Sequence, residues 1–381
     1  MLEAFMRCDS RCVPVATALV LLAACGGKQE GEGGGGDSSP EEKTLFILNW
    51  SDYVGETTVA DFEARTGIKV TYDVFDSNEV LETKLLAGRT GYDVVVPTAP
   101  FLERQIKAGV FLKLDKPKLP NLVNMDPEIM ERTALHDPGN EHSITYLWGT
   151  VGIGYNPDMV RKALGTETID SWSAVLEPAN AAKLEKCGIS MLDSPTDIFA
   201  SVSIYKGLDP NSETPEDLAI VEETMMKVRP HIKYFHSSSY INDLASGEIC
   251  VAVGWNGDVL QARDRGAEAA NPVRVAYAIP KEGAINYFDM LAIPADAPHP
   301  GNAHQFINFI MDPAVIAKVS NKVRFANGNA ASLPLIDARV REDSTIYPGA
   351  EVRARLHQDL AETPEFSREM NRAWTRIRTG Q

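Results

Sequence analysis

Strand-like and helix-like segments alternate in the chain from Thr44 to Leu114. Three runs, at residues 45–48, 68–74 and 92–96, have the apolar or alternating pattern of strands. The stretches that follow them have helical patterns, and the first two end at Gly67 and Gly88, residues suited to a helix C-cap. A β-α-β-α-β order builds a parallel sheet with right-handed crossovers, so we predict an α/β fold.

The carboxyl ends of parallel strands meet at one rim of the sheet, where α/β folds bind their ligands. Residues 50–53 follow the first predicted strand, Asp76-Ser77 follow the second, and Thr98 follows the third. We therefore expect these residues to face one crevice. Asp76 and Glu79 have the spacing of a capping box, which predicts that they also open the second helix.

The segment Asn49–Tyr53 combines two aromatic rings with a carboxylate. Trp50 and Tyr53 would attract an organic cation through their ring faces, and Asp52 would pair with its charge. An alternative is a plain strand-to-helix turn, in which Ser51 or Asp52 caps the helix and Trp50 fills the core.

The same pattern recurs later in the chain. A predicted buried strand at 249–253 ends in Trp255, with Asp258 three residues further on. Tyr287 and Asp289 lie in another apolar strand, and a buried Asp needs a partner because an unpaired one is costly. Asp197 follows Ser194-Pro195 at the start of a helix, where it is most simply a capping acid.

The remaining chain is expected to hold further regular elements. Extended runs at 146–155 and 273–280 cross between two lobes, a helix covers 302–319, a turn covers 325–329, and the tail holds two more helices.

The N-terminus has the features of an export signal. Arg7 and Arg11 precede a short apolar run that ends in Leu22-Ala23-Ala24-Cys25, which resembles the lipobox of bacterial lipoproteins, with Cys25 as the lipidated residue. Either Met1 or Met6 is the start. Residues 26–43 are rich in Gly, Glu and Ser and are expected to form a flexible tether.

Composition and motifs exclude several classes of function. The net charge of −16 argues against nucleic-acid binding, which needs clustered Lys and Arg. No G-x-S-x-G, H-E-x-x-H or P-loop motif is present, the histidines are scattered, and no later stretch has the length of a membrane span. We expect no enzyme activity, no cofactor and no metal.

Cys187 and Cys250 are the only cysteines after the signal segment. An exported compartment is oxidising, so a disulfide between them is the default expectation. Two separate buried thiols are the alternative.

The sequence resembles the periplasmic putrescine/spermidine-binding proteins of bacterial polyamine ABC transporters, and the putrescine-type branch fits better. The resemblance covers about residues 45–374 and is carried by the segments 49–53, 72–81, 136–140, 234–245, 254–259 and 279–284. It implies a two-lobed periplasmic binding protein (type II) fold with a hinge and an interlobe ligand cleft. It also implies that Cys187 and Cys250 form a disulfide.

The resemblance further implies which residues hold the ligand. The family's cleft positions fall on Trp50, Ser51, Asp52, Tyr53, Thr98, Asp197, Trp255, Asp258, Tyr287, Asp289 and Phe325. This chain departs from the family's common pattern at several of these positions, notably with Asp197 in place of Glu. Asp258 and Asp289 are expected to clamp one ammonium group of a diamine, Asp52 and Asp197 to serve the other partly through water, and the aromatic rings to sandwich the methylene chain.

The implied function is the capture of polyamines, most simply putrescine, for delivery to a membrane-embedded ABC permease by a monomeric, membrane-anchored periplasmic lipoprotein. A sensor that docks on a membrane receptor, or a spermidine-preferring transport protein, is the alternative. The predicted organisation is a signal peptide at 1–25, a linker at 26–43, lobe 1 at 44–148 plus 271–320, and lobe 2 at 149–270 plus 321–381.

Overall fold

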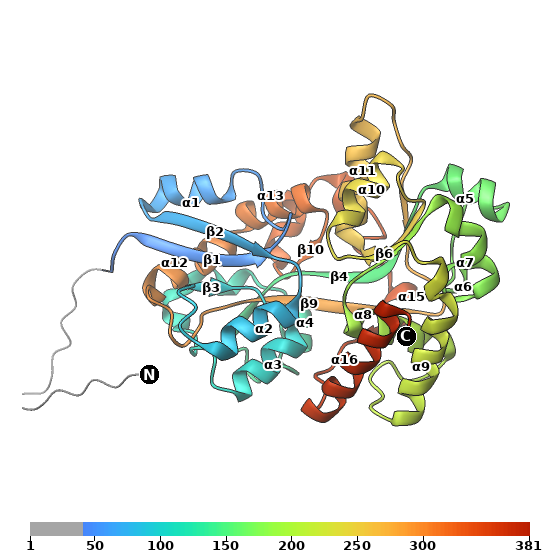
Figure 1. The fold of residues 1–381 in the computed structure, drawn as a ribbon. Coiled ribbons are helices and arrows are strands. Elements are labelled where there is room, and N and C mark those ends of the chain that lie inside the picture. Colours follow the sequence, from blue (N-terminus) through green and yellow to red (C-terminus); the bar gives the residue numbers. More distant parts are fainter. Residues whose placement is uncertain (1–40) are drawn as a thin grey trace, which may run out of the picture. The chain divides into compact units, whose positions relative to one another are not determined.

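The computed structural model describes residues 41–381, which form one compact unit (Figure 1). The predicted signal peptide, the predicted lipidation site at Cys25 and most of the predicted linker lie outside the described residues. Within residues 41–381, no helix has the length and apolar character needed to cross a membrane.

A mixed sheet of eleven strands runs through the described part of the chain, in the order β2-β1-β3-β9-β4-β7-β5-β6 along its main path. Three short strands join it at the side, β8 and β10 on β4 and β11 on β9. The strands are β1 Thr44–Trp50, β2 Lys69–Phe75, β3 Val94–Val95, β4 Ser143–Tyr155, β5 Ile189–Met191, β6 Tyr234–Phe235, β7 Val251–Trp255, β8 Ala276–Ala278, β9 Ala284–Ala292, β10 Ala326–Asn327 and β11 Leu356–Gln358.

Helices lie above and below these strands in the view of Figure 1, which confirms the predicted α/β class. The α-helices of the described residues are α1 Thr58–Thr66, α2 Asn78–Ala87, α3 Ala99–Lys107, α4 Pro127–Thr133, α5 Pro157–Leu164, α6 Ser173–Leu176, α7 Pro178–Leu184, α8 Pro195–Lys206, α9 Pro215–Val228, α10 Ser239–Ser246, α11 Asn256–Glu268, α12 Pro300–Ile310, α13 Pro313–Val323, α14 Ala338–Arg341, α15 Ala350–Arg353 and α16 Pro364–Thr379. The short 3₁₀ helices are η1 Lys116–Lys118, η2 Pro120–Asn124, η3 Glu185–Cys187, η4 Arg229–His231 and η5 Ala330–Leu335.

Two long strands connect two groups of elements. Every residue of β4 is buried; its first part pairs with β9, and its last part, Val151–Tyr155, pairs with β7. Figure 1 shows β4 and β9 running between β1–β3 with α1–α4 on one side and α5–α9 on the other. We call the first group lobe 1 and the group around β5–β7 and α5–α11 lobe 2. This arrangement is that of the predicted two-lobed fold.

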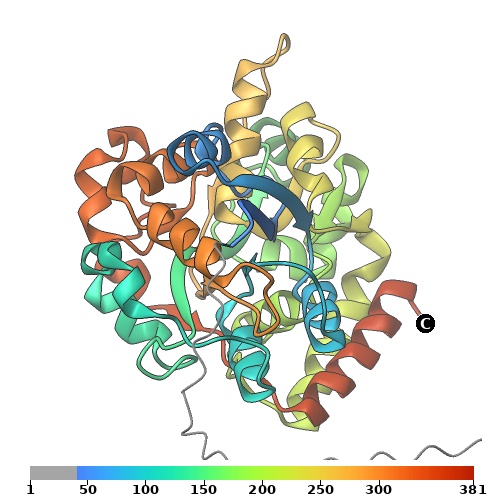
Figure 2. The ribbon, with the colours of Figure 1, turned by 90° about the vertical axis from the view of Figure 1, so that its left-hand side faces the viewer.

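The exact lobe boundaries stay a prediction, and two elements of the tail bear on them. β10, which was assigned to lobe 2, pairs with Leu147-Trp148 in the part of β4 that also pairs with β9. Helix α16 packs on α8 and α9 of lobe 2, and Figure 2 shows it at the edge of the molecule, away from the orange helices around α12 and α13.

The local signals at the start of the chain are confirmed. β1 pairs in parallel with β2 and with β3, so the strands end at one rim, where Trp50 lies opposite Phe75. Helix α1 ends at Gly67 with a left-handed φ of 73°, as a C-cap glycine should. Gly88 likewise follows the end of α2.

Several local predictions are wrong. The side chain of Ser77, and not that of Asp76, caps α2 by accepting from the backbone N–H of Val80. The third strand contains only Val94–Val95. The predicted helix at 302–319 is two helices, because Asp312 caps a new helix at Pro313, whose missing N–H suits a first helical position. The predicted turn at 325–329 includes β10. The tail was expected to hold two helices, and it holds the 3₁₀ helix η5 and the three α-helices α14, α15 and α16.

Candidate ligand-binding cleft

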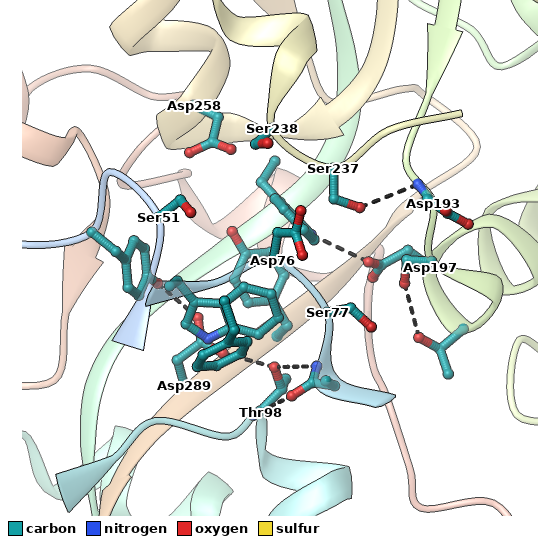
Figure 3. Close-up of a pocket in the computed structure, with 18 of the residues that line it drawn as sticks. Ser51, Asp76, Ser77, Thr98, Asp193, Asp197, Ser237, Ser238, Asp258 and Asp289 are labelled. Atoms are coloured by element: carbon teal, nitrogen blue, oxygen red, sulfur yellow. Dashed lines mark hydrogen bonds between the residues drawn. The ribbon is translucent and has the colours of Figure 1, made fainter. Parts of the chain in front are cut away.

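A cavity lies at the rim where β1 and β2 end, between residues of the two lobes, and its space of about 770 Å³ includes the opening to solvent (Figure 3). Ten of the eleven predicted site residues line it: Trp50, Ser51, Tyr53, Thr98, Asp197, Trp255, Asp258, Tyr287, Asp289 and Phe325. The predicted crevice residues Asp76 and Ser77 line it as well. The structure therefore brings together residues that are up to 275 positions apart in the sequence, from 50 to 325.

Asp289 of β9 lies in the wall of the cavity and has the partners that its burial requires. Its carboxylate accepts a hydrogen bond from the Tyr53 hydroxyl at 2.7 Å and another from Thr98 Oγ1 at 2.8 Å. Thr98 is held in turn by Asn78, whose side-chain amide donates to Oγ1 at 2.9 Å. Burial raises the pKa of Asp289 to about 6, and the two hydroxyl donors lower it only in part.

Asp258 lies in the first turn of α11, directly after β7. It is 5% exposed, and its Oδ2 accepts from the Tyr240 hydroxyl at 2.8 Å. Burial raises its pKa to about 7, and the nearby negative charges of Asp52 and Asp289 add to this effect. An ammonium group in the cavity would stabilise the ionised form of this carboxylate.

Asp197 sits at the start of α8 and faces the cavity, as Figure 3 shows. Its Oδ2 accepts from Trp255 Nε1 at 3.2 Å. Burial, followed by the charge of Glu79, raises its pKa to about 7, while Ser194 and Trp255 donate and oppose that rise. Ser194 is the N-cap residue of α8 as predicted, yet its side chain makes no capping bond to the helix backbone. A capping role alone therefore does not explain why the Asp197 carboxylate accepts a hydrogen bond from Trp255.

The aromatic residues form continuous walls. Trp50 is fixed by a bond from Nε1 to the Val96 carbonyl at 2.9 Å, and its ring meets that of Trp255 edge-to-face at 5.6 Å between centroids. Tyr53 meets Phe325 edge-to-face at 4.9 Å. A methylene chain held between two parallel rings would need two contacts of about 3.5–4.0 Å each. At this spacing the two tryptophan rings leave no room for a methylene chain between them.

Asp52 is the predicted residue that does not line the cavity. Its backbone has a φ of 54°, a left-handed conformation that is uncommon outside glycine. Its carboxylate pairs with Arg265 of α11 at 2.8 Å, at the outer edge of the cleft. The structure therefore places Asp52 in an ion pair with a residue of lobe 2, and Asp52 is not among the residues that line the cavity.

Sequence reasoning did not assign a second set of lining residues to the site. They come from the end of β2, the start of α2, α3, the loops before α8 and α10 with the first turns of these helices, and the segment after β11. These residues are Phe75, Asn78, Glu79, Phe101, Asp193, Ser194, Thr196, Ser237, Ser238, Ile241 and Asp359. The capping signal at Asp76–Glu79 did locate the start of α2.

The cavity is negatively charged and aromatic. None of the described residues that line it is a Lys, Arg or His. The Tyr287 hydroxyl in its wall is buried and has no hydrogen-bond partner within residues 41–381. Buried carboxylates without cationic partners, next to aromatic faces, are suited to bind an organic cation.

The predicted disulfide is confirmed and lies away from this cavity. Cys187 at the end of η3 bonds to Cys250 just before β7, with their Cα atoms 5.4 Å apart. Neither cysteine lines the cavity.

Comparison with known proteins assigns the family. Residues 57–345 match the family model described as bacterial extracellular solute-binding protein. The chain is 53% identical over 343 residues to the putrescine-binding periplasmic protein PotF of Escherichia coli, with 90% of this chain and 93% of PotF covered. It is 51% identical over 342 residues to the putrescine-binding periplasmic protein SpuD of Pseudomonas aeruginosa, with the same coverage of 90% and 93%.

Solved structures agree with this assignment. The structure described as a putative spermidine/putrescine ABC transporter from Listeria monocytogenes aligns with a TM-score of 0.80 at 28% identity, covering 89% of this chain and 100% of that one. The spermidine/putrescine ABC transporter substrate-binding protein PotD of Streptococcus pneumoniae aligns with a TM-score of 0.71 at 25% identity, covering 89% and 99%. These matches confirm the predicted resemblance and the predicted fold, and they agree with the expectation that the chain is not an enzyme. The chain belongs to the family of bacterial extracellular solute-binding proteins.

Proposed function

We propose that this protein captures a linear diamine, with putrescine as the favoured ligand, and delivers it to an ABC permease for import. The observation that carries the proposal is the cavity itself, in which the buried Asp258 and Asp289 and the half-buried Asp197 lie beside aromatic rings, without a cationic side chain among the described lining residues. Two relatives with more than half of their aligned residues identical are named as putrescine-binding periplasmic proteins.

The chemistry of a diamine fits this cavity. Its two ammonium groups stay charged at neutral pH, as the Lys side chain does. One ammonium would bind Asp258 and Asp289, and the other would bind Asp197, with water completing its hydrogen bonds. The methylene chain would lie along Trp50 and Trp255, since a cation–aromatic contact in a dry cleft contributes about 2 kcal/mol.

The setting of the protein is part of the same proposal. Export to the periplasm with a lipid on Cys25 would hold a monomeric binding protein at a membrane through the tether of residues 26–43. The lobes would close on the amine, and the closed form would dock on the permease. A sensor that docks on a receptor, and a protein that prefers spermidine, remain the competing functions, and the amine series below separates the second of them.

Isothermal titration of residues 41–381 with a series of amines tests the proposal. We expect putrescine to bind with micromolar affinity or better, about −8 kcal/mol. Butylamine has the same length of carbon chain and one charge, so it should bind about a hundredfold or more weaker, because the second site would keep an unpaired carboxylate. Spermidine binding that is tighter than putrescine binding would favour the competing ligand. Equal binding of butylamine and putrescine, or no binding of any amine, would contradict a diamine site.

A further inference from the structure

The segment between β11 and α16, residues 359–363, forms a strap along one end of the cavity. Its position is fixed from lobe 2, since the Leu360 N–H donates to Asn211 at 2.9 Å and the Thr363 hydroxyl donates to Glu213 at 2.8 Å. It is also fixed from lobe 1, where Arg104 of α3 pairs with Glu362 at 2.6 Å. A segment held by both lobes presents its side chains in a defined place.

Asp359, the first residue of this strap, lines the cavity next to Asp197. Among residues 41–381 its carboxylate has no ion-pair partner and receives no side-chain hydrogen bond. In this respect it differs from Asp258 and Asp289, which accept from tyrosine hydroxyls. A cation in the cavity would therefore stabilise Asp359 more than the acids that already have donors.

The groups around Asp359 disfavour its ionised form. Burial, and then the charges of Glu362 and Asp197, raise its pKa well above the usual range, and Arg104 acts in the opposite direction. Arg104 is engaged elsewhere, with Glu82 at 3.3 Å and Glu362 at 2.6 Å. Glu79, another acid that lines the cavity, accepts a hydrogen bond from the Ser77 hydroxyl at 2.5 Å and has no ion-pair partner within residues 41–381.

We propose that Asp359 is a further ligand-binding residue, which takes the second ammonium group of the amine together with Asp197. The proposal rests on the function proposed above and assigns two carboxylates to each end of the ligand, Asp258 and Asp289 at one end and Asp197 and Asp359 at the other. The strap thereby makes the binding of the second ammonium depend on a segment that both lobes hold.

The space beyond Asp359 gives this residue a part in selecting the ligand. A second cavity of about 670 Å³ lies between α8, α9 and the strap, and it shares Thr196 and Asp359 with the first. The end of the ligand cavity is thus formed by a carboxylate with open space behind it. Asp359 would stop a diamine by pairing with its terminal charge, while a longer amine would extend past it.

Substitution Asp359→Asn tests the proposal, because it keeps the shape and removes the charge. We expect putrescine affinity to fall about tenfold or more in titration of residues 41–381, while Asp359→Glu, which restores the charge, retains most of the affinity. The melting temperature of the unliganded protein should stay level or rise in Asp359→Asn, because the amide is neutral and the surroundings of this position disfavour an ionised carboxylate. Glu131→Gln, on an exposed side chain with no hydrogen bond or ion pair among the described residues, is the charge-matched control and should leave affinity unchanged.

Two results would overturn the assignment. One is wild-type putrescine affinity in Asp359→Asn, and the other is a loss of affinity accompanied by a fall in the melting temperature, which would mark a structural role. Failure of the wild-type protein to bind any amine would instead overturn the proposed function, and with it this assignment. The first of these results, together with tight putrescine binding by the wild-type protein, would leave the proposed function intact and would remove only the role of Asp359.

Discussion

Buried carboxylates in this cleft are kept in place by neutral donors, so their charge is available to a ligand. Asp258 accepts from Tyr240, Asp289 accepts from Tyr53 and Thr98, and none of these three donors carries a positive charge. The donors fix the direction of each carboxylate and leave lone pairs for ammonium groups. Each acid is therefore preorganised for a cation that the protein does not supply.

Substitution Asp258→Asn should weaken putrescine binding by about 2–5 kcal/mol, because one ammonium group loses a desolvated charged partner. Asn keeps the shape of the side chain, so the fold of α11 should persist. Titration checks the affinity, and circular dichroism checks the helix content. Unchanged putrescine affinity would remove Asp258 from the binding site.

At position 197 the chain has Asp where the family that it resembles often has Glu, and this difference affects the length of ligand that would fit. Asp197 is one methylene shorter than Glu, which leaves space beside the second ammonium. We expect Asp197→Glu to sharpen the preference for putrescine over cadaverine and spermidine, because an ill-fitting longer amine would leave a charge unpaired. Competition binding measures the ratio. If the ratio does not move, the side chain serves the start of α8 and its bond to Trp255 only.

The sequence predicted the acids that follow strands or lie beside aromatic residues, because parallel strands must end at a common rim. It did not predict Asp359 as a cavity residue, because no local pattern marks it, and it identified Glu79 only by its capping-box spacing at the start of a helix. It also placed Asp52 among the ligand residues. The left-handed backbone at Asp52 turns this carboxylate toward Arg265, a feature that residue spacing does not reveal.

At the scale of elements, the start of α11 is packed against the aromatic wall of the cleft. Gly257 lies in the first turn of this helix, and a Cβ atom there would overlap the ring of Phe325. The absence of a side chain lets Phe325 lie directly on the helix backbone. Phe325 in turn contacts Tyr53, which donates to Asp289.

We expect Gly257→Ala to destabilise the protein by about 1–3 kcal/mol, the usual cost of forcing extra atoms into a packed site. Putrescine affinity should also fall, because the displaced ring forms part of the cavity wall. Gly349→Ala is the matched control, since Gly349 has a φ of −67° and open space around its Cα. Chemical denaturation of both variants gives the comparison. Equal stability of the two variants would show that Phe325 moves aside without cost.

The disulfide joins η3 to the chain just before β7, across a separation of 63 residues. Removing it with the double substitution Cys187→Ala and Cys250→Ala should lower the free energy of unfolding by about 4 kcal/mol, as expected for closing a loop of this length. Putrescine affinity should change little, because neither cysteine lines the cavity. Free-thiol labelling of denatured wild-type residues 41–381 should detect none, and two labelled thiols would contradict the bond.

Element types followed from the sequence where a pattern was long or ended in a clear cap, as with α1 and Gly67. The predicted ends of strands and helices were wrong where contacts with distant parts of the chain determine them. β3 is only two residues long because only Ile47 and Leu48 of β1 pair with it, although the apolar run is longer. The break between α12 and α13 was missed because Pro313 was included in one continuous helical pattern.

For the whole molecule, the raised pKa values couple pH to both folding and binding with opposite signs. The folded pKa values of Asp197 and Asp258 are about 7 and that of Asp289 is about 6, all above an unfolded value near 3.8. The stability that these acids contribute is therefore present in full below about pH 4 and is lost as the pH rises toward 7. Binding of a dication needs the ionised acids, so affinity rises over the upper part of the same range.

We expect putrescine affinity to fall as the pH is lowered from 8 to 5, and we expect the melting temperature of the unliganded protein to rise over the lower part of that interval, below about pH 7. Titration and thermal unfolding at each pH measure the two effects. In Asp258→Asn both dependences should be shallower, because one titrating group is lost. Affinity that does not depend on pH would mean that the cleft acids remain ionised throughout.

The long strand β4 couples the unfolding of the two lobes. All thirteen of its residues are buried, and it pairs with β9 on the side of lobe 1 and with β7 and β8 on the side of lobe 2. If either lobe melted alone, it would strip the backbone partners from a strand that the other lobe still needs. Heating should therefore unfold both lobes in a single cooperative transition. A substitution that destabilises one lobe should then also lower the temperature at which the other lobe unfolds.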